Sequence, residues 1–556
     1  MSGIRFSGMA SGMDTESIVK QLMDVERLKL NKYNEQKQIK EWTQEAYNDV
    51  NKDIANFMLD TKKELGVGFG GSIGSASWIK EAISSNTDAI DVSANSSAVS
   101  GSHSLEVVHL AKGVNGASSE AIKDKNGEVI TSDDTLENLF GISGDYKVKI
   151  NNVELTFSKD DKLSDIANEI NEKVSDVKAS FDITAKRFFI SNTGTGTSTG
   201  LKIENIDNNP QNLFKDKLRL NVTNGAGITE ELTYGKNYIG QDAEINFDGA
   251  NNITYSSNNF TINGISITAK AEETTTIKVD TDVDGVYDKI KGFVDKYNEL
   301  IDKLDKKIGE KRYRDYQPLT SEQKETMDEK TIELWEKKAK SGLLKGDEHI
   351  NRMLAATRSG LYEEVYSDVS KGDLGKLSKF SFISEIGITT GNYKDKGKLQ
   401  IDEKELKDAI RKDADGVMDL LFSTSNVTES DINNATTLDE KSKLEAERRA
   451  ETGLINRLYD DMVDGMKNII DKSGTGDNAS LYRNVKSNIL IDFVTKKGSI
   501  SLLHKDVVNI EKQIVRENSR LANVEDRYWK QFTAMEKAMN KMNSQSSWLA
   551  SQMGGM

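Results

Sequence analysis

The stretch from Val507 to Met542, VVNIEKQIVRENSRLANVEDRYWKQFTAMEKAMNKM, decides how this chain must be assembled. Its apolar residues recur at alternating spacings of three and four, and Glu517 takes one core position. That spacing is typical of a coiled coil, in which one stripe of a helix packs against a second helix. The predicted core residues are Val507, Ile510, Ile514, Leu521, Val524, Tyr528, Met535 and Met542, with Phe532 and Met539 in the same register. The stripe requires a partner helix.

The other end of the chain offers that partner. Asp14 or Thr15 can cap a helix, and the apolar pattern that follows continues to about Leu65, where four glycines end it. The apolar positions are Ile18, Leu22 and Val25, followed by Ile39, Trp42, Ala46, Val50, Ile54 and Phe57. We therefore predict that the two ends pair and that everything between them is inserted.

The outermost residues bury too little surface to offset the entropy of ordering the chain. We expect residues 1–40 and 520–556, which form the predicted leg, to stay disordered until they dock onto a partner. The apolar side chains predicted to make that contact are Ile18, Leu22, Val25, Trp548, Leu549 and Met553.

The middle of the chain changes character from about residue 75 to residue 279. It is rich in Ser, Thr, Asn and Gly and in alternating apolar residues, which indicates strands, and Asn263-Gly264 has the composition of a hairpin turn. We predict one β-rich domain from residues 76–112 and 236–279 and a second from 113–235. The second contains one helix, at KLSDIANEINEKV.

Helical periodicity returns near Asp284 and continues along Val286, Ile290, Phe293, Tyr297, Leu300 and Leu304. Residues 41–75 and 280–519 are predicted to form a helical bundle with an extension at about 315–370. The polar stretch 423–449 is interpreted as an exposed loop or a solvated helix. The predicted fold class is therefore multidomain α+β, with a terminal coiled coil, a helical bundle and β-rich domains inserted between the end helices.

Composition excludes several classes of function. The 556 residues include 90 acidic and 75 basic side chains, and a net charge of −15 disfavours a nucleic-acid partner. Cysteine is absent, which removes disulfides and thiolate metal sites. No apolar run approaches the roughly 20 residues that span a membrane. The N-terminus lacks the basic and apolar regions of a cleaved signal peptide.

Short motifs that suggest chemistry fail on their context. Asp280 to Gly285 opens like a calcium loop, but Lys291 replaces the closing glutamate, so an acidic strand-to-helix turn is preferred. The glycine-rich stretches 66–71 and 194–200 lack the strand and helix order of a phosphate site. His103 and His109 could face one side of a strand, but they lack two further zinc ligands. We expect no metal, no cofactor and no enzymatic activity.

Several long segments resemble flagellar filament cap proteins, the hook-associated protein 2 (FliD) family. They are SGMASGMDTESIVKQLMDVERLKLNKYNEQK (7–37), SANSSAVSGSHSLEVVHLAKG (93–113), FVDKYNELI (293–301), EIGITTGNYKDKGKLQIDEKELKDAI (385–410) and MNSQSSWLASQM (542–553). The resemblance implies a structural protein that retains exported flagellin at the filament tip and helps it fold and polymerise. In that architecture the termini form a leg and the β-rich insert forms a plate.

The resemblance also implies partners and a location. The partners are flagellin, hook-filament junction proteins, an export chaperone before secretion, and further copies of the chain in a pentamer or hexamer. The location is extracellular, at the flagellum tip, after export without a cleaved signal. An alternative is a secreted adhesin whose β-rich domains bind mucin or a host surface, and a cell-wall or protein-degrading enzyme is a third class for which the sequence offers no catalytic group.

Overall fold

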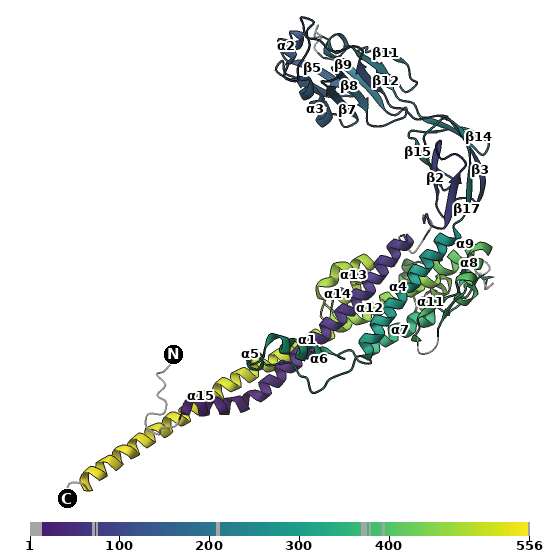
Figure 1. Ribbon diagram of the computed structural model, residues 1–556. Helices are drawn as coiled ribbons and strands as arrows, with labels where there is room; N and C mark the ends of the chain where they lie inside the picture. The colour runs from purple at the N-terminus through teal and green to yellow at the C-terminus, as the bar shows by residue number, and fades with distance from the viewer. Residues whose placement is uncertain are drawn as a thin grey trace. The chain divides into compact units, whose positions relative to one another are not determined.

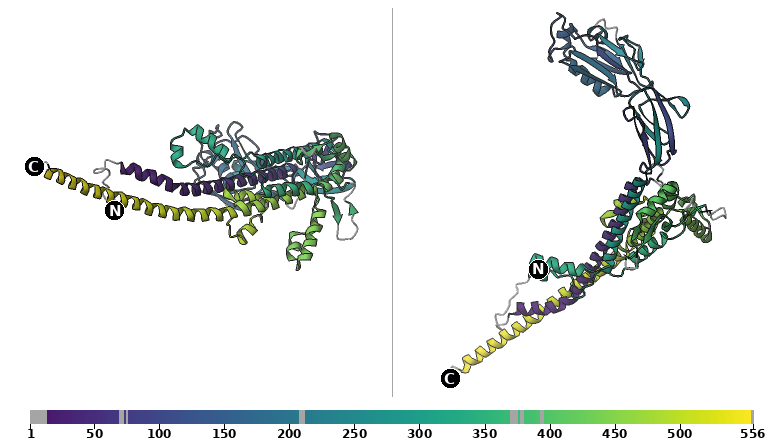
Figure 2. Two further views of the ribbon diagram at one scale, coloured as in Figure 1. Left: turned by 90° about the horizontal axis from the view of Figure 1, so that it is seen from below. Right: turned by 45° about the vertical axis from the view of Figure 1, so that its right-hand side comes forward.

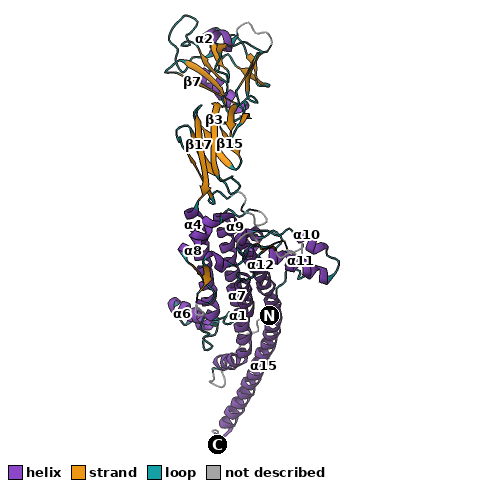
Figure 3. Cartoon of the chain, turned by 90° about the vertical axis from the view of Figure 1, so that its right-hand side faces the viewer, coloured by secondary structure: helices purple, strands orange, loops and turns teal. Residues whose placement is uncertain are grey.

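The computed structural model describes residues 14–68, 73, 76–206, 212–368, 375–376, 380–391 and 395–553. These residues form two compact units. One, the helical unit, contains the described residues up to Gly68 and from Tyr287 onward, and the other, the strand unit, runs from Ile73 to Val286. Figures 1 and 3 show helices dominating the first and strands the second. The predicted multidomain α+β fold, with β-rich domains inserted between the end helices, is confirmed. The four predicted domain ranges subdivide these units and stay predictions.

The helical unit is built around two long helices from opposite ends of the chain, α1 (Thr15–Leu65) and α15 (Leu502–Met553). The helices between them are α4 (Val283–Gly309), α5 (Ser321–Glu325), α6 (Glu329–Lys340), α7 (Glu348–Gly360), α8 (Glu403–Lys412), α9 (Ala414–Phe422), α10 (Glu429–Asn434), α11 (Leu438–Glu451), α12 (Leu454–Ser473), α13 (Ala479–Val485) and α14 (Ile491–Thr495). Two small strand pairs are β18 (Tyr366–Asp368) with β19 (Gly375–Lys376) and β20 (Ile388–Thr390) with β21 (Leu399–Ile401). The stretch 423–449 is mainly solvated helix, one of the two alternatives predicted for it.

Helix α1 begins and ends where the sequence predicts. Asp14 Oδ1 accepts a hydrogen bond from the Ser17 backbone N–H at 3.0 Å, and Gly66 ends the helix with φ of 64°. The helix is continuous across residues 15–40, and α15 is continuous across 520–553. Disorder of the leg before docking stays a prediction. Each helix covers part of the other, which supplies the burial that neither has alone. Residues 1–13 and 554–556 lie outside the described residues.

The core of the helical unit joins α1 to α4 and α12. The rings of Phe57 and Phe293 lie 5.9 Å apart, and Tyr459 lies 6.4 Å from Phe293. Tyr459 also donates a hydrogen bond to the Thr61 hydroxyl at 2.9 Å. The predicted apolar face of α4 is buried, and the prediction that it packs on the end of α1 is confirmed. None of the described helices carries an apolar stretch long enough to cross a bilayer.

The strand unit has two lobes, each with its own core. The first lobe holds β1 (Lys80–Ser84), β2 (Ile90–Ala94), β3 (Gly101–His109), β13 (Ala243–Phe247), β14 (Ala250–Tyr255), β15 (Asn259–Ile262), β16 (Ile265–Ala269) and β17 (Thr274–Thr281). They form antiparallel sheets in the orders β1-β17-β3-β13-β14 and β15-β16-β2. Asn263 and Gly264, with φ of 47° and 78°, join β15 to β16, so the predicted hairpin is confirmed.

The second lobe is inserted between β3 and β13 and is called the inserted lobe. Its strands are β4 (Asn115–Ser118), β5 (Tyr146–Ile150), β6 (Val153–Phe157), β7 (Val177–Asp182), β8 (Arg187–Asn192), β9 (Gly200–Asn205), β10 (Leu220–Thr223), β11 (Thr229–Glu231) and β12 (Asn237–Ile239), in the orders β11-β10-β4-β8-β7 and β12-β9-β5-β6. The predicted helix is α3 (Leu163–Lys173). The prediction of a single helix is wrong: α2 (Leu136–Phe140) and a π-helical turn (Leu213–Lys217) are also present, each too short to show a helical period.

A joint of close-packed backbone connects the two lobes. Lys112 and Gln241 exchange backbone hydrogen bonds of 2.9 and 2.8 Å, and the glycine-rich loop 194–199 lies against them. Thr197 bonds to Asp242 through both its backbone N–H (2.7 Å) and its hydroxyl (2.8 Å), so the loop of one lobe is fastened to the other. A Cβ on Gly196 would lie 2.7 Å from the Ser256 carbonyl oxygen, and one on Gly200 would lie 2.9 Å from the Tyr238 carbonyl oxygen. The glycines of residues 194–200 therefore serve close backbone approach.

His103 and His109 do not share a side, contrary to the prediction. A register shift between β3 and β13 pairs His109 with Glu244 and Val107 with Ile245, so the alternation of side chains reverses between the two histidines. His103 is buried, and its ring nitrogens lie 2.6 Å from Asp248 Oδ2 and 2.8 Å from the Val99 carbonyl oxygen. Both partners accept, so the charged imidazole donates both hydrogen bonds. The hydrogen bond to Asp248 raises the pKa of His103 above its usual value, although burial opposes it.

This histidine makes the stability of the strand unit depend on pH. A raised folded-state pKa gives stability that is fully present below the unfolded pKa of about 6.5 and is lost as pH rises through the folded value. We expect the unfolding temperature of the strand unit to fall as the pH rises above about 6.5 and through the raised pKa of His103, and to fall less in His103→Gln. Calorimetry of both proteins across this range checks it. Equal pH dependence in the two proteins would contradict the assignment.

Candidate functional site: an apolar seam on the terminal helix pair

The two end helices pair in antiparallel fashion, and we call residues 15–40 of α1 with 506–535 of α15 the terminal helix pair. Lys40 Nζ lies 2.8 Å from Asp506 Oδ2, and Lys37 Nζ lies 2.7 Å from Glu511 Oε1. Figures 1 and 2 show the two helices side by side in every view. The predicted pairing of the two ends is confirmed.

The seam between the two helices is lined by side chains from both. Val19 and Met23 of α1 are buried against Leu521 and Val524 of α15. The half-buried side chains packed around them are Leu30, Tyr528, Trp529 and Phe532. Among the other predicted core residues, Val507 is buried and Ile510, Ile514 and Met535 are half-buried.

Sequence reasoning missed Val19 and Met23, although both lie beside the residues it selected. With Glu26 and Leu30 they form a second stripe at spacings of four, three and four on the same helix. Ile18 is half-buried, Leu22 is 38% exposed and Val25 is 67% exposed, and these three lie on the flank of α1. Their role as partner contacts stays a prediction.

A polar cluster interrupts the seam at the position that the sequence predicts. The Glu517 side chain is 5% exposed, and its carboxylate accepts from Arg520 Nε at 2.7 Å and lies 3.3 Å from Lys29 Nζ. Arg520 also pairs with Glu26 at 2.8 Å. Burial raises the pKa of Glu517, but the hydrogen bonds from Arg520 and Lys29 outweigh it and leave the pKa below its usual value. A buried charge with such specific partners fixes the register of the two helices.

Helix α15 continues past Thr15, where α1 begins, and we call residues 537–553 the overhang. At 1.5 Å per residue the overhang is about 25 Å long. The apolar stripe continues from Met535 into the overhang, where Met539, Met542, Leu549 and Met553 keep spacings of three and four, with Ser546 in one position. Met542, Leu549 and Met553 are 64%, 54% and 79% exposed. The prediction of Met542 as a core residue is therefore wrong, because α1 begins too late to cover it.

Trp548 belongs to the overhang but lies off the stripe, since it falls one residue before Leu549. It is 61% exposed. The overhang therefore presents a row of apolar side chains that continues the buried seam, together with one aromatic ring on another face. This arrangement can bind another apolar helix by burying apolar surface, without making or breaking a covalent bond.

The remaining candidate sites have structural roles. Asp282 Oδ1 accepts from the Gly285 backbone N–H at 2.8 Å, so the acidic motif caps α4 after β17 ends at Thr281, as the preferred interpretation holds. Within the described ranges, no group of three or more His, Asp or Glu side chains is placed to hold a metal ion.

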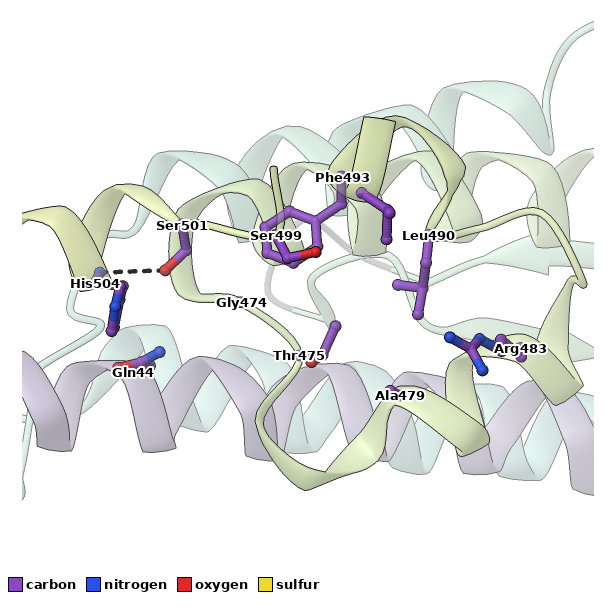
Figure 4. Close-up of a pocket in the computed structure, with 11 residues that line it drawn as sticks. Gln44, Gly474, Thr475, Ala479, Arg483, Leu490, Phe493, Ser499, Ser501 and His504 are labelled. Carbon is purple, nitrogen blue, oxygen red and sulfur yellow. Dashed lines mark hydrogen bonds between the residues drawn. The ribbon is translucent and has the colours of Figure 1, made fainter. Parts of the chain in front are cut away.

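A cavity of about 290 Å³ lies between α1, α13, α14 and the start of α15. Figure 4 shows Ser501 beside His504 at one end of it and Arg483 at the other. The bond drawn there runs from the His504 backbone N–H to Ser501 Oγ, at 3.2 Å, so Ser501 caps α15. Ser501 is thus held as a helix cap and is not aligned on an imidazole base.

Comparisons with known proteins agree on one family. The family model described as the flagellar hook-associated protein 2 C-terminus matches residues 240–544, and the N-terminus model of the same protein matches residues 11–113. A curated relative from Halalkalibacterium halodurans, named flagellar hook-associated protein 2, is 30% identical and covers 98% of each chain. This chain belongs to the flagellar hook-associated protein 2 family.

Further matches to flagellar hook-associated protein 2 are more distant. A relative from Thermotoga maritima is 24% identical over 74% of this chain and 55% of its own. The crystal structure of the D1-D2-D3 domains of the flagellar cap protein FliD from Escherichia coli matches with 18% identity and a TM-score of 0.47, over 77% of this chain and 96% of that one. Inside the inserted lobe, residues 138–194 match the flagellin hook IN motif.

Proposed function

We propose that this protein caps the distal end of the bacterial flagellar filament, where it retains exported flagellin and promotes its folding and polymerisation. The observation that carries the proposal is the overhang, whose exposed stripe continues a buried helix seam. Flagellin and hook-filament junction proteins are the partners that we propose for it. Family membership supports the same role.

The proposed setting follows from that role. Several copies, five or six, assemble at the filament tip outside the cell, after export without a cleaved signal and with an export chaperone bound beforehand. The work is done by binding energy, and we propose no enzymatic activity. The adhesin alternative receives no support from the relatives, whose names refer to the flagellum.

The test removes the exposed apolar side chains of the overhang without changing the fold of the helical unit. In a strain that lacks its own cap protein, Leu549→Ser with Met553→Ser, or deletion of residues 545–556, is expected to stop filament growth and release flagellin into the medium. Because these side chains are exposed, the free energy of unfolding should change by less than about 0.5 kcal/mol. Filament length by microscopy and flagellin in the medium are measured.

The matched control is Val515→Ser. Val515 is 64% exposed on the same helix but lies away from the seam, so this variant should support normal filaments. Normal filaments from the Leu549 and Met553 variant would refute the docking role of the overhang.

A further inference from the structure

The helical unit contains a groove of about 610 Å³ that the terminal helix pair does not use. It lies between the end of α1, helix α12, the loop before α10 and the segment after α13. Met58, Tyr459 and Val463 line it, and each is almost fully buried, so they form an apolar floor.

The groove is positively charged within an acidic protein. Its lining has two more cations than carboxylates, namely Lys62, Arg448, Arg483 and Lys486 against Glu429 and Asp460. Arg448 and Lys486 share Asp460 at 3.8 Å each. Lys62 therefore shares Asp460 with two other cations.

Lys62 is the cation that most needs a partner. It is half-buried over the ring of Tyr459, at 5.0 Å from the ring centre, and within the described ranges no carboxylate lies within 4 Å of its amino group. Burial lowers the pKa of Lys62, with Asp460 acting against this and Lys486 adding to it. A carboxylate brought into the groove would relieve the cost of this desolvated charge.

Helices α10 and α11 form an arm that projects from the side of the helical unit (Figure 3). The base of the arm is fixed, since Arg449 bonds to both Glu363 and Asp461 at 2.7 Å. At the tip, Leu438 is 85% exposed and is followed by Asp439, which forms no ion pair in the described part of the chain. The tip thus presents an apolar side chain beside a carboxylate.

We propose that the arm tip of one copy docks into the groove of a second copy, with Leu438 on the apolar floor and Asp439 opposite Lys62. The arm cannot reach its own groove, because Arg448 lines that groove and lies about 15 Å along α11 from Leu438. The contact is head-to-tail, since it joins two different surfaces, and repetition of such a contact closes a ring or builds a chain. This arm contact rests on the proposed function only because it requires several copies of the chain.

Because the chain contains no cysteine, any disulfide must form between introduced cysteines. The full chain with Leu438→Cys and Ser487→Cys, on the tip and on the rim of the groove, is oxidised and separated without reductant. We expect a ladder of disulfide-linked multimers, because each copy offers both halves of the contact. The control pairs Leu438→Cys with Leu334→Cys, which is exposed on α6 outside the groove, and it should stay mostly monomeric. A ladder no stronger than the control overturns the proposal.

A charge exchange provides an independent measurement. Lys62→Glu and Asp439→Lys are each expected to weaken self-association about tenfold in analytical ultracentrifugation, and their combination in one chain should restore most of it. Restoration excludes misfolding as the cause, and failure of the combined variant to recover overturns the pairing. The capping proposal is tested separately by filament growth. If variants without the arm contact still form multimers and support filaments, the arm contact is refuted and the capping proposal is not.

Discussion

Arg457→Ala is expected to lower the free energy of unfolding of the helical unit by about 3–5 kcal/mol. Arg457 is 1% exposed in the first turn of α12, and its guanidinium donates to the carbonyl oxygens of Gly360 (3.0 Å) and Thr452 (3.0 Å). Longer bonds reach the carbonyls of Glu363 and Glu364. Removing the side chain leaves these buried acceptors without donors and opens a cavity.

Urea unfolding followed by circular dichroism measures this loss. Arg411→Ala is the matched control, because Arg411 is 59% exposed and pairs with Asp408 on the surface, so its loss should cost less than about 0.5 kcal/mol. Arg457→Lys should lie between the two, since it keeps a charge but loses the planar fork. A cost below about 1 kcal/mol for Arg457→Ala would show that the carbonyls find other donors.

Gly240→Ala should destabilise the strand unit by about 3 kcal/mol. A Cβ on Gly240 would meet the carbonyl oxygens of Gly196 and, at 2.6 Å, Lys112. Both are backbone atoms held in the joint between the lobes, so neither can move aside as a flexible side chain would. The added methyl group must therefore separate the loop 194–199 from the strand connections it holds.

Gly144→Ala serves as the control for this change, because a Cβ there meets no atom within 4 Å. Thermal unfolding by calorimetry and limited proteolysis of both variants are compared. We expect protease cuts at the joint in Gly240→Ala and none in Gly144→Ala. Equal resistance of the two proteins would mean that the joint relaxes around the methyl group.

Long periodic patterns predicted the architecture well, because a stripe at spacings of three and four implies a helix and a partner for it. The pairing of the two ends, the limits of α1 and the packing of α4 all followed from such stripes. The pattern failed where two stripes occupy one helix. Ile18, Leu22 and Val25 look as suitable as Val19 and Met23 until the position of α15 decides which face is covered.

Other features depend on residues that are distant in sequence. The side that His109 faces depends on a bulge opposite β13, and the glycine at position 196 is explained by the close approach of Asp242 and Ser256. The groove and the arm base likewise combine side chains from several segments of the helical unit. A single sequence carries no local signal for such contacts between distant segments.

The antiparallel pairing of α1 with α15 also sets the order in which the molecule can fold. Arg520 and Glu26 are 494 residues apart, and closing an unstructured loop of that length costs about 5 kcal/mol of chain entropy. The first helix leaves the ribosome with Val19 and Met23 unpaired, and they remain so until the last helix has been made. The contacts between the ends therefore raise the contact order of the chain, which is the property that slows folding. A chain interrupted before Leu521 lacks the side chains that cover Val19 and Met23.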